Sequence, residues 1–569
     1  MEIYTNTLKN ILYNKFVDGP MALQEFTNQN ISEILVALNS KNIFNLTVKT
    51  IEHLANEKKY HYQIVLLEIL NKKINNNQRI KYLLAEAFFK IKGFKEALFH
   101  LNQITTQNFN IEHYKLLANI YYQSQDFIKC LGALKIIEKE EGQDIHKTLM
   151  ALECHRRLIH IDQSENELHK LHNYNINDLK FSLLKIQIEL LKGNFEQSLS
   201  SLERILAKNS KDTEFLDLYA LVLSKYRKYD KAIEILKKLR DLGTPTLTSI
   251  ANIHLNKREY KLGFKYLSEA STNTFIENYF ISKNFKKWSG DNHTKQYLFI
   301  YSGEGVGLGD KIFYFRYVIE IFRRFNNIKI IFCINSDREI HLFQYEEIKV
   351  INIKDVSFNI NLENQNYFSS LTKLAFILTK NDDNKNFSIN FLPSSIIKFK
   401  MWNDYFLAFR SKKNIGINWK GNVKFKLDVY RSINLRLLEP ILQNNLFNFF
   451  ILNTDLLEKE KLILQKYDNV KIIDSELLLD EKENTFVDTI EIIKNLDLVL
   501  TTDTALAHIS SLLKLKTFLI LEHSPFWYWD TDDKDNIYSN KEVKFFKQDA
   551  PGNWEFVINK INLELKKII

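Results

Sequence analysis

The feature that most constrains this fold is a period of about 34 residues in the first half of the chain. An aromatic or branched apolar residue returns at this interval. These residues are Tyr60, Phe94, Phe127, Ile161, Phe195, Tyr229 and Tyr260, with spacings of 34, 33, 34, 34, 34 and 31. A repeat of this length is one supersecondary unit, and it buries its apolar face only against neighbouring units. The period therefore predicts an α-solenoid.

Each period also carries the packing stripe of a helix. Leucine stands seven residues after every periodic residue, and a small side chain stands three residues after all but the first. The leucines are Leu67, Leu101, Leu134, Leu168, Leu202, Leu236 and Leu267; the small residues are Ala97, Cys130, Ser164, Ser198, Ala232 and Gly263, with Gln63 in the first period. Nine residues upstream, alanine recurs at Ala85, Ala118, Ala220 and Ala251. Positions three and seven apart share one helix face, so we expect hairpins whose helices approach closely at the small residues.

This pattern resembles the tetratricopeptide repeat family over residues 45–275. Residues 1–44 are expected to form a helical N-terminal cap or a degenerate repeat, and residues 276–296 a linker. Solenoids of this kind present an extended surface to peptides or partner proteins, or they dimerise. We therefore expect the repeats to bind a protein partner, which the sequence does not identify.

After the linker the pattern changes to short apolar runs separated by helices such as 311–325, 486–495 and 504–514. The predicted strands are 297–301, 328–334, 349–353, 414–419, 448–453, 470–474, 496–501 and 516–521. This alternation predicts parallel, doubly wound sheets. We expect two Rossmann-like α/β domains, 297–412 and 413–569, with a closing helix from about residue 553. Ligands of such sheets bind at the carboxyl ends of the strands.

A glycine-rich loop follows the first predicted strand and precedes a helix. It reads Ser302-Gly303-Glu304-Gly305-Val306-Gly307-Leu308-Gly309-Asp310. Glycines let the backbone approach a ligand closely, and a helix N-terminus favours negative charge. Asp310 has a second interpretation, as a first-turn carboxylate that the helix dipole stabilises by about 0.3–1 kcal/mol.

Two more polar loops follow later strands. One strand ends in Thr501-Thr502-Asp503, and a helix begins near Thr504 with Ala505 and His508 in its first turns. Its free backbone N–H groups suit an anion, although an ordinary cap followed by a surface histidine fits equally. The other loop carries Lys420, Gly421 and Asn422, then Asp428, Arg431 and Ser432. Its cations suit phosphate, against the alternative of a solvated loop.

In this order, the loops resemble glycosyltransferase family 9, the heptosyltransferase-like enzymes, and especially a bacterial branch with tetratricopeptide repeats ahead of the catalytic region. That branch carries a G-E-G-x-G-D-like loop, V-W-x-G-N followed by R-S-I, D-T-A-x-A-H, and P-x-W-x-W. The matching segments here are 303–310, 418–422 with 431–433, 503–508 and 525–529. The resemblance covers the last half of the chain.

The resemblance implies a GT-B fold and an inverting, metal-independent sugar transfer from a nucleotide sugar, with no cofactor. Asp310 matches the family's proposed general base. The implied nucleotide-sugar-binding residues are Gly307, Gly309, Lys420, Asn422, Arg431, Ser432, Asp503, Thr504, Ala505 and His508. Among them, Thr504 and Ala505 would hold the donor diphosphate, and Arg431 would offset leaving-group charge where heptosyltransferases place a lysine nearby. The acceptor would be a glycan, a lipopolysaccharide or a protein.

The chain departs from this family pattern in two places. The glycine loop is one residue longer than the commoner G-E-x-G-L-G-D form, and Tyr528 stands where an arginine is often found. The flanking Trp527 and Trp529 fit either core packing or a wall that stacks on the base. Residues 530–533 (DTDD) look like the D-x-D metal motif of the other glycosyltransferase fold, but they follow the last strand-rich segment, so we expect no metal there.

Charge and cysteine content argue against other classes of protein. The net charge of +9 is spread along the chain rather than gathered into basic runs, so we expect no nucleic-acid partner. No apolar stretch is long enough to span a membrane, and Cys130, Cys154 and Cys333 are scattered, which favours a reduced, cytoplasmic compartment. Two other functions fit the architecture: a repeat scaffold with a catalytically silent GT-B domain, and a protein O-glycosyltransferase.

Overall fold

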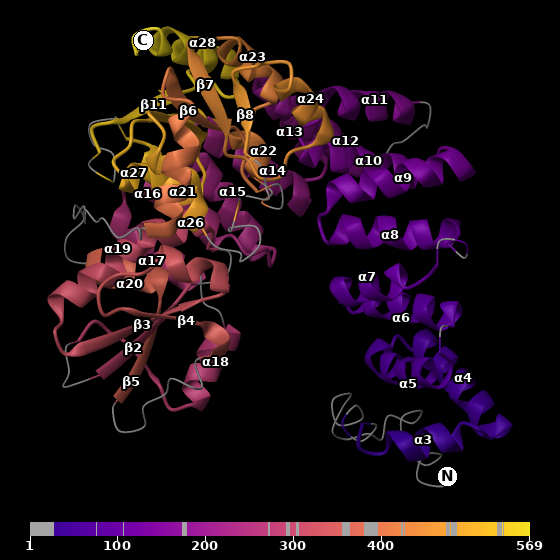
Figure 1. Ribbon diagram of the computed structural model, residues 1–569. Coiled ribbons are helices and arrows are strands. Elements are labelled where there is room, and N and C mark those ends of the chain that lie inside the picture. Colours follow the sequence, from indigo (N-terminus) through magenta and orange to yellow (C-terminus); the bar gives the residue numbers. More distant parts are fainter. Residues whose placement is uncertain are drawn as a thin grey trace. The chain divides into compact units, whose positions relative to one another are not determined.

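The computed structural model divides into two compact units, residues 1–181 and 182–569. The residues that the structure describes are 25, 28–75, 77–105, 107, 109–172, 179–270, 274–291, 296–302, 306–355, 365–379, 396–422, 425, 427–473, 478, 486–531, 538 and 540–568. The first unit is helical, and the second combines further helical hairpins with two parallel sheets (Figure 1).

The periodic residues each begin the second helix of a hairpin. These second helices are α5 (Tyr60–Lys73), α7 (Phe94–Asn102), α9 (Phe127–Glu141), α11 (Ile161–His172), α13 (Phe195–Lys208), α15 (Tyr229–Asp241) and α17 (Tyr260–Ala270). The first helices are α4 (Lys41–Asn56), α6 (Gln78–Lys90), α8 (Ile111–Gln123), α10 (Ile145–Arg157), α12 (Leu179–Leu191), α14 (Thr213–Lys225) and α16 (Leu247–Asn256), preceded by α3 (Ile31–Ala37). The predicted solenoid is confirmed.

The hairpin turns share one backbone conformation. Two residues before each periodic residue, φ is positive, and the next amide donates back to a carbonyl five residues earlier, as in the 2.8 Å bond from Gly93 to Phe88. The residues with positive φ are Lys58, Lys92, Gln125, Ile159, Gly193, Arg227 and Arg258. This is the usual way to satisfy the last carbonyls of a helix, and it turns the chain sharply into the second helix.

The packing stripe lies inside the hairpins, as predicted. The small residues Ala97, Cys130 and Ala232 are fully buried, and the leucines of the stripe are buried too. Gly263 shows why the position must be small. A Cβ there would lie 2.6 Å from Cγ of Leu255 and 3.1 Å from the carbonyl oxygen of Ala251 on the partner helix.

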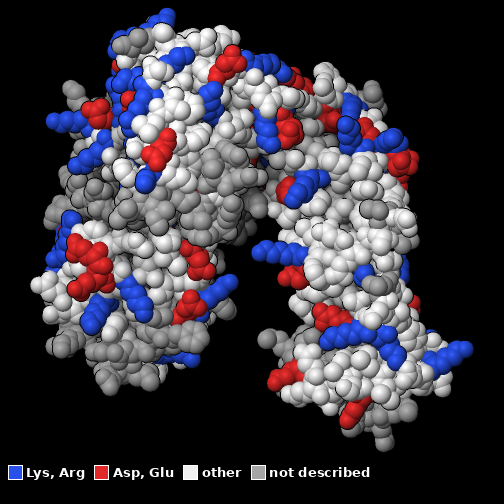
Figure 2. All heavy atoms as spheres, in the orientation of Figure 1, with Lys and Arg blue, Asp and Glu red and all other residues white. Residues whose placement is uncertain are grey.

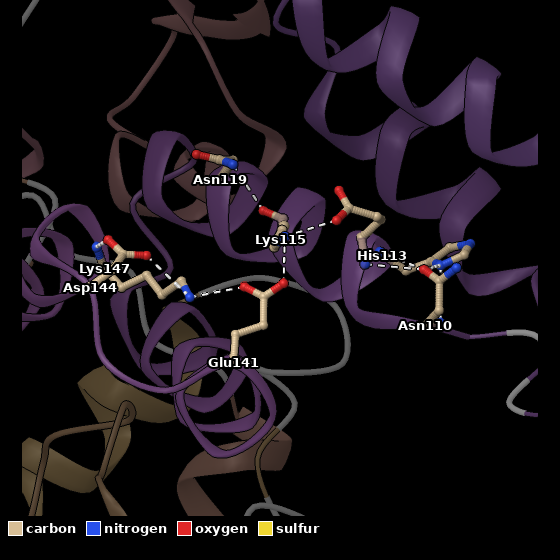
Figure 3. Close-up of polar contacts among 8 residues, drawn as sticks. Asn110, His113, Lys115, Asn119, Glu141, Asp144 and Lys147 are labelled. Atoms are coloured by element: carbon tan, nitrogen blue, oxygen red, sulfur yellow. Dashed lines mark hydrogen bonds and ion pairs between the residues drawn. The ribbon is translucent and has the colours of Figure 1, made fainter.

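Ion pairs connect the two helices of one hairpin, and that hairpin to the next, in the first unit (Figure 3). Nζ of Lys115 on α8 lies 2.7 Å from the Glu141 carboxylate at the end of α9, and Nζ of Lys147 on α10 lies 3.0 Å from the same carboxylate. Asp144 caps α10 by accepting hydrogen bonds from the amides of His146 and Lys147. These partly exposed pairs fix neighbouring helices against one another, each contributing little stability on its own.

Two parallel sheets build the α/β part of the second unit. In the described residues, the first has the order β1-β5-β2-β3-β4 and the second β11-β10-β9-β6-β7-β8. Their strands are β1 (Lys286–Lys287), β2 (Gln296–Tyr301), β3 (Ile328–Ile334), β4 (Lys349–Asn352), β5 (Gln365–Ser370), β6 (Lys413–Asn418), β7 (Phe447–Ile451), β8 (Val470–Ile472), β9 (Leu498–Thr502), β10 (Thr517–Leu521) and β11 (Val543–Lys547). The predicted strands all form, while β1, β5 and β11 were not predicted.

Helices cover both faces of each sheet, so the predicted doubly wound α/β fold is confirmed. Helices α19 (Leu308–Arg324) and α20 (Leu371–Thr379) pack on one face of the first sheet, and α18 (Thr274–Ser282) packs on the other. Helices α26 (Val487–Lys494) and α28 (Trp554–Leu565) pack on opposite faces of the second sheet. The order is thus an α-solenoid followed by two Rossmann-like domains.

The helix before the second sheet belongs with that sheet in its packing. Helix α21 (Ile396–Leu407) packs on α26, and Nε1 of the fully buried Trp402 donates to Oδ1 of Asp488 at 2.8 Å. In the described residues, no helix combines the length and apolar character needed to cross a membrane. On the face that Figure 2 draws, basic and acidic side chains are interspersed over the described surface.

The small-residue position gives a stability prediction. Gly263→Ala should destabilise the protein by about 1–3 kcal/mol, because the added methyl group overlaps the buried Leu255 side chain. Gly132→Ala is the control, because Gly132 lies in helix α9 with no atom near its missing Cβ; this change should stabilise by up to about 1 kcal/mol. Denaturant unfolding of both variants measures the difference, and equal effects would contradict the packing account.

Candidate functional site

The candidate site lies where the carboxyl ends of the two sheets meet. Helix α19, which follows β2, contacts helix α27 (Ala505–Leu512), which follows β9. Gly309 lies against the ring of His508 at this contact: a Cβ on Gly309 would be 3.0 Å from Cδ2 and Nε2 of the ring. Any larger residue would separate the helices. The glycine therefore brings the first turn of α19 beside the start of α27.

Asp310 lies in the first turn of α19 and is partly exposed. Its Oδ1 accepts a hydrogen bond from the hydroxyl of Tyr528 at 3.1 Å, and its Oδ2 accepts one from the amide of Gly307 at 3.3 Å. The interpretation of Asp310 as a first-turn carboxylate is confirmed, and the same side chain also binds Tyr528 of the second sheet's domain. The earlier part of the glycine loop, Gly303 to Gly305, lies outside the described residues.

The surroundings of Asp310 stabilise the protonated form of its carboxyl relative to that of an exposed aspartate. Burial raises the pKa of the Asp310 carboxyl to about 6, and the charge of Asp503 adds to the rise. The hydrogen bond from Tyr528, the charge of Arg431 and the Gly307 amide act in the opposite direction. A carboxyl that titrates this close to neutral pH can accept a proton from a hydroxyl and later release it.

Asp503 and Thr504 form the turn between β9 and α27. Nε1 of Trp529 donates to Oδ1 of Asp503 at 2.9 Å, and burial raises the pKa of this carboxyl while Arg431 counters the rise. Thr504 begins the helix without capping it through its side chain; its hydroxyl instead accepts from Nδ2 of Asn418 at 3.2 Å. Within the described residues, the first amides of α27, including that of Ala505, therefore have no cap from the Thr504 side chain.

Arg431 is held by the loop after β6. Its Nε donates to Oδ1 of the buried Asp428 at 2.9 Å, and the Ser432 hydroxyl donates to Oδ2 of Asp428 at 2.7 Å. The amide of Gly421 donates to the Ser432 hydroxyl, and a Cβ on Gly421 would lie 2.3 Å from Asp428. Arg431 also acts on the titration of Asp310 and Asp503, so its charge lies among the site carboxylates.

Lys420 is paired away from these carboxylates. Its Nζ lies 2.7 Å from Oε2 of Glu460 and 2.9 Å from the carbonyl oxygen of Asp455, and both side chains of the ion pair are about nine-tenths buried. The amide of Phe425 donates to the carbonyl oxygen of Asn422 in the same loop. Among the described contacts, Lys420 and Asn422 build the loop that carries Arg431 and are not joined to Asp310.

His508 is buried, so the alternative of a surface histidine is wrong. Its Nδ1 lies 2.5 Å from the hydroxyl of Tyr538, and its ring contacts Tyr528 edgewise and Trp529 at a tilt. Burial, with the positive charges of Arg316 and Arg431, lowers the pKa of His508 to about 3. The ring is therefore neutral and serves as a packing contact between α19 and α27.

The aromatic segment after β10 reaches both carboxylates. Tyr528 and Trp529 lie in a short 3-10 helix, η6 (Trp527–Trp529), and all three side chains are buried. Tyr528 stacks on Phe313 of α19 with ring centroids 4.8 Å apart. Burial of the tryptophans fits core packing. Asp530 of the D-x-D-like stretch pairs with Arg227 and Lys547, whereas Asp532 and Asp533 lie outside the described residues.

The sequence patterns assign no role to two residues that shape the site, Asp428 and Tyr528. Asp428 was noted but not assigned, although it orients both Arg431 and Ser432. In the sequence, Tyr528 is notable only because it stands where an arginine is often found. Its hydrogen bond to Asp310 joins residues far apart in the chain and becomes evident only in the folded structure. Thr502 is fully buried, and its hydroxyl has no hydrogen-bond partner among the described residues, beside the α27 start.

Comparison with known proteins gives no sequence match: no family model matches, and neither does any curated protein. Solved structures do resemble the chain. A tetratricopeptide repeat protein from Parabacteroides merdae is 14% identical over 42% of this chain and 97% of its own, with a TM-score of 0.37. A glycosyl transferase family 9 protein from Veillonella parvula is 9% identical over 48% of this chain and 90% of its own, with a TM-score of 0.32.

A third solved structure combines both kinds of region. It is a mutant of the O-GlcNAc transferase from Thermobaculum terrenum, 9% identical over 79% of this chain and 88% of its own, with a TM-score of 0.32. The three structures are a helical-repeat protein and two glycosyltransferases.

The titration of Asp310 predicts a gain in stability when its charge is removed. Its pKa of about 6 exceeds the usual value of an unfolded aspartate, about 3.9, so the native state binds an extra proton between these values. The native state therefore loses stability as pH rises from about 4 to above 6. In Asp310→Asn, residue 310 cannot titrate. The free energy of unfolding of this variant, relative to that of the wild type, should therefore be higher at pH 7 than at pH 4 by on the order of 1–3 kcal/mol.

Asp144 supplies the control of opposite sign. Burial alone would raise its pKa, but hydrogen bonds from Lys147 and the amide of His146 lower it. Its contribution is present at neutral pH and is lost as pH falls through the lowered pKa, so Asp144→Asn should destabilise most at pH 7. Unfolding midpoints at pH 4 and pH 7 for Asp310→Asn, and at about pH 3 and pH 7 for Asp144→Asn, test this, because the lowered pKa of Asp144 places its loss below about pH 4. A wild-type-like pH dependence in Asp310→Asn would contradict it.

Proposed function

We propose that this protein is an inverting, metal-independent glycosyltransferase that moves a sugar from a nucleotide-sugar donor to a hydroxyl acceptor. The observation that carries the proposal is the convergence of a near-neutral carboxyl, Asp310, with the uncapped start of α27 and the charge of Arg431. A base and an anion site on adjoining sheets are what such a transfer requires.

Asp310 serves as the general base. The acceptor hydroxyl gives its proton to the Asp310 carboxylate as its oxygen attacks the anomeric carbon, and the bond from that carbon to the donor diphosphate breaks. Attack on the face opposite the leaving group inverts the anomeric centre. The raised pKa of Asp310, caused chiefly by burial, makes the carboxylate a stronger base than an exposed aspartate.

The leaving nucleoside diphosphate carries the developing negative charge. The amides of Thr504, Ala505 and Leu506 lie at the start of α27, where the helix dipole favours an anion and, in the described structure, the Thr504 side chain does not cap the turn. Arg431 supplies a fixed positive charge, oriented by Asp428. The buried Thr502 hydroxyl, unpartnered among the described residues, offers one further donor.

No metal is needed in this mechanism, because Arg431 and the helix start offset the charge of the leaving group. The carboxylate of Asp530, the first of the D-x-D-like stretch, is occupied by the ion pairs with Arg227 and Lys547. The repeats would recruit or orient the acceptor, which is a glycan, a lipopolysaccharide or a protein.

Removing the base should separate binding from chemistry. Asp310→Asn should reduce transfer by about 100-fold or more, because a positioned general base contributes about 10²–10⁴-fold. Binding of the nucleoside diphosphate should persist, since the α27 start and Arg431 are unchanged. Calorimetry with a panel of nucleoside diphosphates measures binding, and release of nucleoside diphosphate from the matching nucleotide sugar measures transfer.

The exposed Asp404 on α21 supplies the matched control, because Asp404→Asn makes the same chemical change away from the site. It should leave binding and transfer unaltered. Failure of the wild-type chain to bind any nucleotide or nucleotide sugar would rule out the enzyme proposal and favour the scaffold. Full transfer by Asp310→Asn would remove Asp310 from the mechanism.

A further inference from the structure

The last repeats contact the segment whose side chains donate hydrogen bonds to Asp310 and Asp503. This segment, Glu522–Asp530, runs from the end of β10 through η6. Nζ of Lys225, at the end of α14, pairs with the Glu522 carboxylate, and both side chains are largely buried. The hydroxyls of Tyr229 on α15 and Ser524 lie 3.3 Å apart. These contacts lie within the second unit, between residues almost 300 positions apart in the chain.

Arg227 contacts the segment at two points. It occupies the positive-φ turn between α14 and α15, with φ of 56°. Its Nη2 donates to Oδ1 of Asp530 at 2.6 Å and to the carbonyl oxygen of His523 at 3.2 Å. One side chain of the repeats thus binds both ends of the segment, at His523 and at Asp530.

The neighbouring turns add apolar and backbone contacts. Tyr260 and Phe264 of α17 meet the Trp527 ring edgewise, with centroids 5.9 and 5.6 Å away. Gly193, the equivalent turn residue one hairpin earlier, lies against Gly552: a Cβ on Gly552 would be 2.5 Å from Cα of Gly193. Three successive hairpin turns therefore dock on the second sheet's domain.

Two consecutive side chains of the same segment bind the site carboxylates. Glu522, Ser524, Trp527 and Asp530 contact the repeats, whereas Tyr528 donates to Asp310 and Trp529 donates to Asp503. A shift of the segment by a fraction of an ångström would lengthen both bonds together. The two carboxylates are on different sheets, so the segment is their shared support.

We propose that Arg227 of the repeat region is a positioning residue of the transfer site, which acts through segment Glu522–Asp530 on Asp310 and Asp503. The proposal rests on the proposed function for its catalytic meaning, but the positional coupling can be measured without any substrate. It also gives the repeats a second task besides partner binding, because they hold the site in shape.

The matched variants use the repeat symmetry. Arg227→Gln removes the ion pair at a residue that is more than one-third exposed, so the fold should persist. Arg227→Lys keeps the charge and should restore the contact. Arg258→Gln is the control, since Arg258 occupies the same turn position in the next hairpin, with φ of 61°, and its side chain has no hydrogen bond or ion pair within the described residues.

The first readout is hydrogen exchange of the full chain, measured on peptides covering 306–311 and 526–531. The Gly307 amide, which donates to Asp310, and the Trp529 amide, which donates to the carbonyl oxygen of Phe526, report on the two ends of the coupling. Arg227→Gln should exchange several-fold faster in both peptides. Arg227→Lys and Arg258→Gln should match the wild type. An unchanged 306–311 peptide in Arg227→Gln would overturn the proposal.

The second readout is affinity for the nucleoside diphosphate that the wild type binds. Arg227→Gln should weaken it by about 2- to 30-fold, as expected for a residue coupled to a site that it does not touch. Unchanged affinity beside faster exchange would show that the segment does not position the site. If the wild type binds no nucleotide, the enzyme proposal fails, while exchange in 306–311 continues to decide the coupling.

Discussion

The close approach of helices α19 and α27 is the constraint on which the site depends. It exists because Gly309 has no side chain and because His508, opposite it, is neutral and buried. A charged histidine would have to be desolvated at high cost in this contact. With the helices in contact, the Gly307–Asp310 turn of the first domain and the β9 turn of the second lie together, and Tyr528 can reach Asp310 across the junction.

The site gathers more negative than positive charge. Among the described residues, Asp310, Asp428, Asp503 and Glu522 interact with the cations Arg431 and Lys225. Burial raises the pKa values of Asp310, Asp503 and Glu522, and the charge of Asp503 adds to the rise at Asp310 and Glu522. Such an arrangement costs stability, and proteins retain it where a carboxyl must titrate near neutral pH. The cation Lys225 comes from the repeats, so the solenoid contributes to the electrostatics of the α/β half.

The parts that could be predicted from sequence are those set by local periodicity. Strand β3 forms over the predicted residues because IKIIFCI is continuously apolar, and the hairpins form because the small residues and leucines recur on one helix face. Strand β5 was missed because QNYFSS is largely polar and becomes a strand only by pairing between β1 and β2. The turn residues with positive φ were missed because most are not glycine.

The candidate site divides in the same way. The sequence pattern places Asp310, Asp503 and Thr504 between a strand and a helix, and the structure has them there, while Arg431 lies in the loop region after β6, as the pattern indicates. The contacts that give them their properties, from Tyr528, Asp428 and Trp529, join residues 3 to 218 positions apart and depend on how the sheets pack. Lys420 shows the converse: its type and place suit phosphate, yet the fold pairs it with Glu460.

The central claim is that the start of α27 and Arg431 hold the donor diphosphate beside Asp310. The most direct measurement is a crystal structure of the full chain with a bound nucleoside diphosphate. We expect phosphate oxygens within hydrogen-bond distance of the Thr504 and Ala505 amides and near the Arg431 guanidinium. The Asp310 carboxylate should face the side of the terminal phosphate that the protein leaves uncovered. A nucleotide bound with its phosphates away from the α27 start would contradict it.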